Sequence, residues 1–260
     1  MRALVFGHPG SGIELATSEL RGAGFEADSW DGTEPNCQAQ DATVLDSGHW
    51  PLLLRLECTA PVCAGRSGPP WLSPNPPLRP AVLLSEWEAR RERQTAARLR
   101  STLVVDSTRL TPDTLRERLA QLPLQGVCQP RTLPVVVLES FGYPAGVPLD
   151  MDWCVDARQM RNPYWEPELR ERSGLDPMVQ AFVLEQESAR RLLEGIEGLV
   201  ASQLPSFMEP RLRQRLVLRL AIGCTGGFHR SVAMVEELSR RLGDRGLKTV
   251  IWHRDLGPGK

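Results

Sequence analysis

The amino-acid sequence predicts an α/β protein built from two domains. Its 260 residues are more than one ordinary hydrophobic core requires, and chains of this length commonly divide into two domains. Short apolar runs typical of buried strands alternate with amphipathic helical patterns, and this order favours parallel sheets. Between residues 215 and 243, an apolar strand pattern, a glycine-rich turn and an amphipathic helix follow one another. This succession of strand, glycine-rich turn and helix is typical of sites that bind anions.

The first strand pattern, residues 2–6, leads into a loop and then a helical pattern. The loop carries Gly7, Gly10, Ser11 and Gly12. The two outer glycines have the spacing of a P-loop, but Ile13 and Glu14 stand where its lysine and its Ser or Thr should follow. That lysine would neutralise the nucleotide phosphates, and the hydroxyl would hold Mg²⁺. We therefore interpret residues 1–127 as a P-loop-kinase-like parallel sheet of the NTPase type with a degenerate nucleotide loop. No cofactor is certain, and any residual binding of ATP or GTP is expected to be weak.

The rest of this domain alternates between loops, strands and helices. We predict loops at residues 26–50 and 57–80, strands at 51–56 and 102–106, and helices at 85–100 and from Pro112 onward. Glutamates interleave with the arginines of the 85–100 helix, so that helix is interpreted as having a solvated charged face. Residues 123–134 lack periodicity and form the predicted linker.

A second domain is predicted for residues 134–260, and it begins with an apolar strand pattern. Asp150, Asp152 and Asp156 follow this strand and could act as general acids, as acceptors for sugar hydroxyls or as loop caps. From Asp176, one long helix is predicted. Its apolar face carries Val179, Phe182, Val183, Leu192, Leu193, Ile196 and Leu199. That face is either core or a subunit contact, and we expect a homo-oligomer.

The strand predicted at residues 216–222 ends in a glycine-rich turn. Its glycines are Gly223, Gly226 and Gly227. At these positions the lack of side chains lets backbone N–H groups turn toward a ligand. A helix is predicted over 231–243 with Gly243 as its stop, so its positive N-terminal end faces the turn and favours a phosphate or carboxylate. His229 would add a hydrogen-bond donor, and Arg230 a bidentate fork. The alternative is an ordinary tight connection between strand and helix.

Residues 224–231 also fit the Cys-x5-Arg-Ser/Thr loop of cysteine-dependent phosphatases. In that hypothesis Cys224 is the nucleophile, Arg230 binds the phosphate and an aspartate is the acid. A working NTPase is a third hypothesis, and the altered P-loop argues against it.

A longer match points to a different protein class. Residues 223–232 fit the pattern Gly-Cys-Thr-Gly-Gly-x-His-Arg-Ser-Val and closely resemble the RapZ family of bacterial nucleotide-binding and RNase-adapter proteins. Further motifs of that family occur in the same order at residues 139–142, 146–150, 156–158, 162–167, 169–170 and 173–176. The resemblance covers residues 134–255. It implies a regulatory sensor whose C-terminal domain binds a phosphorylated amino sugar or similar metabolite, while the N-terminal domain is a scaffold that has lost ATP or GTP hydrolysis.

The glycine-rich turn and the family motifs together define a predicted phosphate and ligand site. Its residues are Cys224, Thr225, Gly226, Gly227, His229, Arg230, Ser231, Asp150, Asp156, Asn162 and Arg254. Arg254 is included because residues 253–254 resemble a terminal His-Arg pair of the family. Tyr164 stands where the enteric RapZ proteins have a histidine, to which the family resemblance gives a role. No metal ligand is predicted.

Composition and chain ends define the expected partners and compartment. The net charge of −1 excludes a protein that coats nucleic acid through overall basicity. The enteric relatives have a C-terminal basic cluster implicated in RNA binding, whereas this chain has only Gly-Pro-Gly-Lys260, so RNA binding is expected to be weaker than in enteric RapZ. A protein partner is the other expectation. The six cysteines lack disulfide or zinc spacing, and neither a signal peptide nor a membrane span is apparent, which predicts a cytoplasmic protein.

Overall fold

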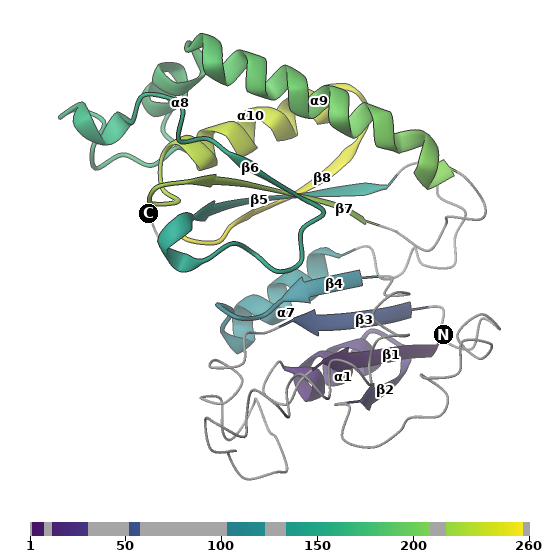
Figure 1. Cartoon of the computed structure of the whole chain (residues 1–260). Helices are drawn as coiled ribbons and strands as arrows, with labels where there is room; N and C mark the ends of the chain where they lie inside the picture. The colour runs from purple at the N-terminus through teal and green to yellow at the C-terminus, as the bar shows by residue number, and fades with distance from the viewer. Residues whose placement is uncertain are drawn as a thin grey trace, which may run out of the picture. The chain divides into compact units, whose positions relative to one another are not determined.

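The computed structural model of the chain describes residues 2–7, 12–30, 52–57, 103–122, 134–208 and 217–256. The chain divides into two compact units, Met1–Pro130 with Gln214–Leu216 and Arg131–Arg213 with Val217–Lys260. Each unit contains one sheet, and all strand pairs are parallel (Figure 1). The predicted α/β class is therefore confirmed. Within these described ranges, no helix combines the length and apolar character needed to cross a membrane.

The first unit has a sheet with the strand order β2-β1-β3-β4. Its elements are β1 (Arg2–Gly7), α1 (Ile13–Gly22), β2 (Glu26–Trp30), β3 (Leu52–Glu57), β4 (Leu103–Asp106) and α7 (Pro112–Gln121). The two helices are joined by an ion pair of 3.0 Å between Arg116 and Glu19. The side chain of Thr111 caps α7, as its place before Pro112 predicted.

The strand β2 corrects the prediction of a loop over residues 26–50. Ala27 is buried, whereas Glu26, Asp28 and Ser29 are exposed, so this edge strand has no apolar alternation to reveal it. Parallel pairing with β1 forms the strand instead, which is a case of tertiary context overriding local propensity. The predicted helix at 85–100 lies outside the described residues, as does the predicted linker at 123–134 except for Pro134.

The second unit has a sheet with the strand order β6-β7-β5-β8. Its elements are β5 (Val135–Gly142), η2 (Tyr143–Ala145), β6 (Trp153–Asp156), η3 (Pro163–Trp165), α8 (Pro177–Leu184), α9 (Glu187–Met208), β7 (Val217–Cys224), α10 (Arg230–Asp244) and β8 (Lys248–His253). The helices α8, α9 and α10 lie on one side of this sheet (Figure 1). Between helices and sheet lies a core that includes Leu138, Leu220, Leu193 and Val235.

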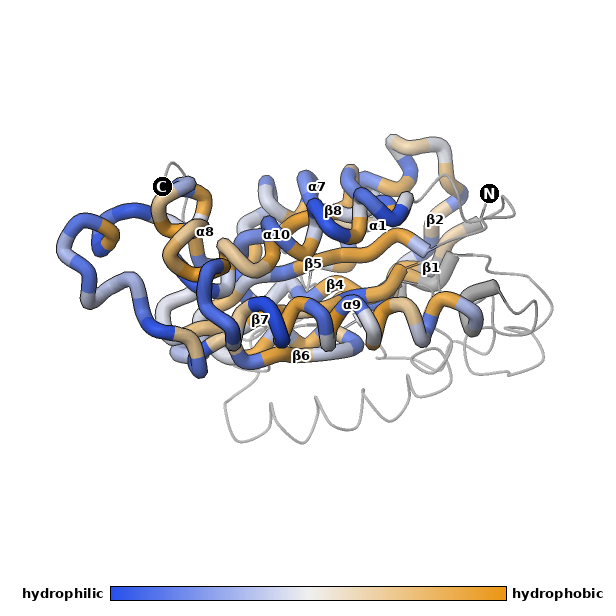
Figure 2. Tube along the Cα trace, turned by 90° about the horizontal axis from the view of Figure 1, so that it is seen from above, coloured by the Kyte–Doolittle hydropathy of each residue, from blue (hydrophilic) through white to orange (hydrophobic). Residues whose placement is uncertain are grey.

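The long helix predicted from residue 177 is two helices, α8 and α9. Glu185 and Gln186 separate them, and the carbonyl of Gln186 accepts the N–H groups of Ala189 and Arg190 at the start of α9. The predicted apolar face is also incomplete, because Leu199 is exposed. Along α9, hydrophilic and hydrophobic residues alternate around the helix (Figure 2), as in a helix with one buried stripe.

The helix α10 does not stop at Gly243, as the sequence suggested, but continues to Asp244. Gly246, with a φ of 80°, is the residue that ends it. The N–H of Leu247 donates to the carbonyl of Leu242, and that of Gly246 to the carbonyl of Gly243. This is the Schellman arrangement, in which the left-handed position after the helix favours glycine.

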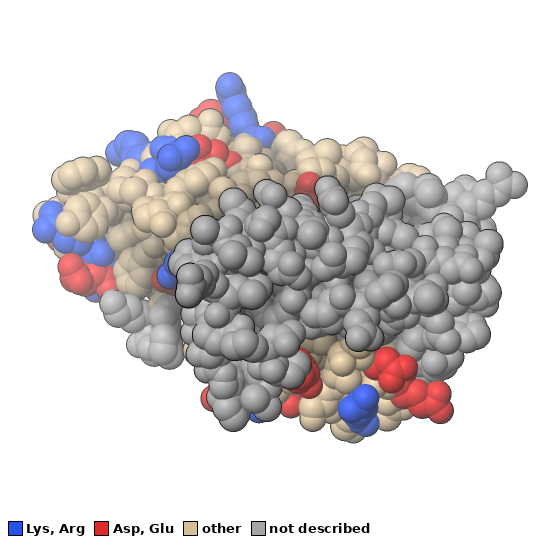
Figure 3. Space-filling model, turned by 60° about the horizontal axis from the view of Figure 1, so that its bottom comes forward, with Lys and Arg blue, Asp and Glu red and all other residues tan. Residues whose placement is uncertain are grey.

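Charged side chains of the described residues are mixed in sign. Arg240 pairs with Glu237 and Asp244 on α10, and Arg241 links Glu237 to Glu197. On the face shown in Figure 3, basic and acidic side chains of the described residues lie next to one another. Exposed pairs of this kind contribute little to stability, but they prevent a broad field of one sign.

Gly223 provides a test of the packing beneath the glycine-rich turn. A Cβ atom at this position would lie 2.5 Å from Cζ of the buried Phe141 ring. We expect Gly223→Ala to lower the free energy of unfolding by about 1–3 kcal/mol, because the ring cannot move without overpacking its surroundings. Urea unfolding measures the change. The matched control is Gly243→Ala in α10, where a Cβ meets nothing within 4 Å and should stabilise the helix by about 0.5–1 kcal/mol. Equal stability of the two variants would contradict this account.

Candidate functional site: the turn between β7 and α10

The turn between β7 and α10 lies at the carboxyl end of the sheet. Cys224 ends β7 beside Gly142, the last residue of β5. Gly227 has a φ of 70°, and a Cβ atom added to it would lie 2.6 Å from the nitrogen of Gly142. Both the backbone conformation and the close approach therefore require glycine at position 227. The carboxyl end of a parallel sheet is where α/β proteins commonly bind ligands.

The backbone of this turn presents N–H groups that have no acceptor among the described residues. Hydrogen bonds within the described part of the chain include none donated by the N–H groups of Thr225, Gly226 or Gly227. His229 is the N-cap of α10, and its side chain makes no capping hydrogen bond. The first N–H groups of a helix carry partial positive charge and need acceptors from outside the helix. The turn is therefore suited to receive an anion.

Arg230 is a buried cation at the base of the turn, only 4% exposed. Its Nη1 donates to the carbonyl of Arg158 at 3.1 Å and to that of Met160 at 2.9 Å. Its Nη2 donates to Oγ1 of Thr225 at 2.9 Å. Nε is also buried and has no hydrogen-bond partner among the described residues. The guanidinium thus ties the turn to the segment after β6, and its Nε keeps an unused hydrogen-bonding capacity within the described part of the chain.

A second segment, residues 162–174, lies against the turn. The N–H of Gly174 donates to the carbonyl of Phe228 at 2.8 Å. A Cβ atom on Gly174 would lie 2.2 Å from the carbonyl oxygen of His229, so only glycine fits there. Within the segment, Oδ1 of Asn162 accepts the N–H of Tyr164 at the start of η3. The two backbones are therefore held together by direct contact.

His229 fastens the same segment through its side chain. Nε2 lies 3.0 Å from the carbonyl of Arg170 and donates to it. Burial lowers the pKa of His229, and the nearby Arg230 also lowers it, while backbone carbonyls act in the opposite direction. Because burial is the largest effect, the ring is neutral at pH 7 with its proton on Nε2. The hydrogen-bond donor that the sequence predicted at His229 is therefore used within the protein.

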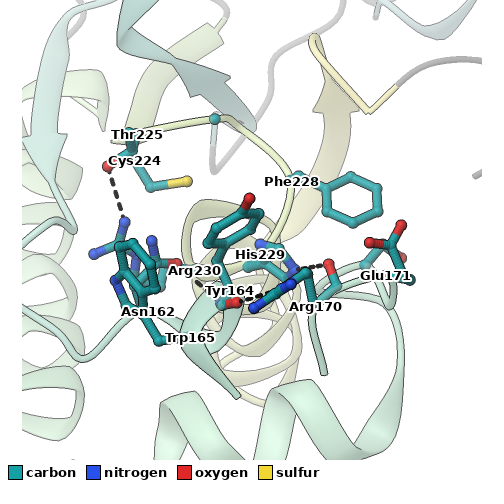
Figure 4. A pocket seen from close by; sticks show the side chains of 12 residues that line it. Asn162, Tyr164, Trp165, Arg170, Glu171, Cys224, Thr225, Phe228, His229 and Arg230 are labelled. Atoms are coloured by element: carbon teal, nitrogen blue, oxygen red, sulfur yellow. Dashed lines mark hydrogen bonds between the residues drawn. The ribbon is translucent and has the colours of Figure 1, made fainter. Parts of the chain in front are cut away.

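A cavity of about 750 Å³ lies between the turn and the 162–174 segment (Figure 4). Its lining residues are Asn162, Tyr164, Trp165, Arg170, Glu171, Ser173, Cys224, Thr225, Gly226, Phe228, His229 and Arg230. Six of these belong to the predicted site: Asn162, Cys224, Thr225, Gly226, His229 and Arg230. The volume lies in the range of small-molecule binding sites.

The remaining predicted site residues of this unit do not line the cavity. Gly227 and Ser231 support the turn, and the hydroxyl of Ser231 is 3.1 Å from the sulfur of Cys224. Asp156 is paired with Arg158, whose hydrogen bonds are the main reason that the pKa of Asp156 is lowered. Asp150 is buried beside a separate small hollow under the sheet.

Arg254 supports the turn from the β5 side and does not line the cavity. Its Nη2 donates to the carbonyls of Gly142 and Gly146 and to the carboxylate of Asp255. That carboxylate also accepts the N–H of Gly142 at 2.8 Å. Arg254, which the sequence predicted as a ligand residue, thus binds backbone carbonyls at the end of β5.

In the first unit, Gly12 has a φ of 96° and is the N-cap of α1, and Gly7 ends β1. Gly10 and Ser11 lie outside the described residues, so their predicted place in a nucleotide loop is not addressed by the structure. Ile13 is buried in the core of its unit, whereas Glu14 is exposed.

The predicted site omitted six of the cavity residues. These are Tyr164, Trp165, Arg170, Glu171, Ser173 and Phe228. Most lie in family motifs at residues 162–167, 169–170 and 173–176, so a signal was present. Motif membership alone did not separate residues facing the cavity from those that shape the segment.

Fold and site together define an α/β domain with a glycine-rich strand-to-helix turn that has an arginine and a ligand-sized cavity beside it. Residues 134–257 match the family model of the RapZ C-terminal domain. The second unit of the chain is therefore similar to the RapZ C-terminal domain.

Similar proteins extend the match beyond that domain. The chain is 42% identical over 166 residues to a nucleotide-binding protein of Corynebacterium jeikeium, covering 64% of this chain and 55% of the relative. It is 39% identical over 160 residues to one of Cutibacterium acnes, covering 62% and 53%. It is 39% identical over 169 residues to one of Geobacter metallireducens, covering 65% and 58%. The chain thus spans about half the length of the curated relatives it matches.

The lowered pKa of His229 predicts a pH dependence. An unfolded histidine takes up a proton near pH 6.5, whereas the folded ring resists protonation because it is buried. The contribution of the neutral His229 ring to the stability of the folded state is therefore complete above about pH 6.5 and decreases as the pH falls through this value. We expect His229→Gln, whose amide can still donate to Arg170, to be less stable at pH 7.5 but to lose less stability between pH 7.5 and 5.5. Urea unfolding at both pH values tests this, and identical slopes for variant and wild type would contradict it.

Proposed function

We propose that the C-terminal unit binds a phosphorylated small metabolite of the amino-sugar phosphate class and that the protein acts as a regulatory sensor for it. The observation that carries this proposal is the coincidence of two unfilled donor sets at one cavity. One is the uncapped N-terminus of α10 with the N–H groups of Thr225 and Gly226, and the other is Arg230, a cation that lines the cavity and whose buried Nε has no acceptor among the described residues. A phosphate supplies several acceptor oxygens and the negative charge that both sets favour.

The rest of the cavity supports an amino sugar as the body of the ligand. Glu171 is the acidic residue among those that line it, and Asn162 and Ser173 contribute an amide and a hydroxyl. A carboxylate complements an ammonium group, while amide and hydroxyl groups can bond to sugar hydroxyls. Asp156 lies outside this lining and is paired with Arg158, so we assign it to the support of the site.

Binding is favoured over phosphatase activity. Cys224 is buried, and its sulfur is hydrogen-bonded to the hydroxyl of Ser231. Asp156, a family-motif aspartate that feels the charge of Arg230, has a lowered pKa, which keeps it ionised rather than ready to donate a proton. The relatives are described as nucleotide-binding proteins and not as hydrolases of phosphate esters.

The proposed phosphate site can be tested by calorimetry with glucosamine 6-phosphate. Arg230→Lys retains a positive charge but removes Nε and the planar fork. We expect its affinity to fall roughly 10- to 100-fold, which corresponds to about 1.5–3 kcal/mol for a charge-assisted hydrogen bond. The matched control is Arg158→Lys, because Arg158 is exposed and does not line the cavity. Cys224→Ser should bind normally, and no variant should release phosphate.

Melting temperatures are measured alongside, since Arg230 also holds the carbonyls of Arg158 and Met160. A folded Arg230→Lys variant with wild-type affinity, or failure of the wild type to bind any sugar phosphate, would refute the proposal. Phosphate release by the wild type that Cys224→Ser removes would establish the phosphatase instead.

We also propose that the N-terminal unit has lost ATP and GTP hydrolysis. Ile13 is 2% exposed and packs in the core, so the position of the P-loop lysine is occupied by an apolar core residue. The next residue, Glu14, adds negative charge in the first turn of α1. A carboxylate near the N-terminus of this helix repels the negatively charged phosphates of a nucleotide.

Purified protein is therefore expected to hydrolyse ATP no faster than a buffer control in a phosphate-release assay, since the main charge-neutralising contacts are absent from the sequence. If turnover is seen, Gly12→Ala and Gly22→Ala separate its source. Gly12 has a positive φ, whereas Gly22 does not and a Cβ there meets nothing within 4 Å. Turnover that only Gly12→Ala abolishes would overturn this prediction.

A further inference from the structure

The cavity has an aromatic side as well as an anion-binding side. Trp165 is 72% exposed and Tyr164 is 46% exposed, and both line the cavity. Tyr164 points toward the turn that carries Thr225 and Phe228 (Figure 4). Because the indole exposes a large apolar surface to water, a ligand that covered this surface would gain favourable free energy.

The aromatic side is built rigidly. Tyr164 and Trp165 belong to η3, where Pro163 fixes the backbone at the first position and the N–H of Trp165 donates to the carbonyl of Asn162 at 3.1 Å. The two rings meet edge to face, with centroids 5.3 Å apart and an interplanar angle of 82°. The exposure of Trp165 is thus a property of an ordered element and not of a chain end.

Arg170 fixes the Tyr164 ring further. Its guanidinium lies over that ring at 5.0 Å from the centroid, and its Nε donates to the carbonyl of Tyr164 at 3.1 Å. The carbonyl of Arg170 accepts from His229. One chain of contacts therefore runs from the N-terminus of α10 through His229 and Arg170 to the aromatic pair.

Resting on the proposed phosphate site, we propose that Trp165 forms a second subsite that selects phosphate esters carrying a ring. The phosphate lies at the turn and at Arg230, and the face of the ring packs on the indole of Trp165. A cavity of about 750 Å³ has room for both parts, and a phosphate group alone would leave the aromatic side in contact with water. The shared chemistry is a ring face joined to a phosphate, which a hexosamine phosphate and a nucleoside monophosphate both provide.

Three phosphate esters separate the two subsites in calorimetry with the full chain. Glucosamine 6-phosphate and adenosine 5′-monophosphate carry rings of different kinds, while glycerol 3-phosphate has no ring. We expect the wild type to bind at least one of the ring esters roughly tenfold or more tightly than glycerol 3-phosphate, in line with the strength of stacking on aromatic side chains. The better of the two ring esters then identifies the source of the ring.

Substitution of Trp165 provides the specific readout. Trp165→Ala should weaken binding of the preferred ring ester about tenfold or more and leave glycerol 3-phosphate within about twofold, whereas Trp165→Phe should retain most of the affinity. The control is Leu175→Ala, because Leu175 is 43% exposed in the same unit but does not line the cavity.

The outcomes distinguish this inference from the function on which it rests. If all three esters bind equally to the wild type, or if Trp165→Ala leaves ring-ester affinity unchanged, the ring subsite is wrong although the phosphate site stands. Equal weakening of all esters by Trp165→Ala assigns the residue to shaping the turn and also overturns the inference. A change of oligomeric state in sedimentation without a change in affinity would place Trp165 in a subunit contact instead. If no ester binds, the proposed phosphate site itself has failed.

Discussion

The backbone of the turn after β7 lies directly against the backbone at the end of β5, and the whole pocket depends on this contact. Cβ atoms on Gly142 and Gly227 would approach backbone atoms to 2.8 and 2.6 Å, so neither position has room for a side chain. The carboxylate of Asp255, just after β8, then accepts the N–H of Gly142. Three neighbouring strand ends are thereby joined, and the N–H groups of the turn are directed by fixed backbone geometry. Donors held in this way need no reorganisation when an anion arrives.

Arg230 serves the fold and the candidate site with different atoms of one side chain. A buried guanidinium loses hydration, and this cost is offset only if its N–H groups find acceptors. The carbonyls of Arg158 and Met160 and the hydroxyl of Thr225 accept from its two Nη atoms, and Nε remains. The charge also contributes to the lowered pKa of Asp156, after the larger effect of Arg158. Affinity for an anion and the stability of the empty site are therefore linked at this residue.

Local pattern was sufficient to predict the strand, turn and helix around residues 216–244, because glycines and apolar periodicity report directly on backbone shape. It failed for the short edge strands β2 and β6, which bury few of their side chains fully and are formed by pairing with β1 and β7. Six residues of the predicted site line the cavity: Asn162, Cys224, Thr225, Gly226, His229 and Arg230. Gly227, Ser231, Asp150, Asp156 and Arg254 do not. Sequence motifs could not separate these groups, since the direction of a side chain in a loop is set by distant contacts. Trp165 was part of a recognised motif, but its exposure depends on how η3 packs against α8.

Gly174 joins the turn to the outer surface of the same unit. Its N–H is bonded to the carbonyl of Phe228, which lines the cavity, and α8 begins at Pro177, shortly after it in the chain. No side chain separates the two backbones to absorb a displacement. A ligand that shifted Phe228 would therefore shift Leu175 and Met178, both exposed apolar residues at the start of α8. Thermodynamic coupling is reciprocal. A macromolecule that bound those two side chains in their shifted position would therefore raise the affinity for the ligand by the same factor by which the ligand raises the affinity for the macromolecule. A partner that binds outside the cavity would then respond to whether a ligand occupies it.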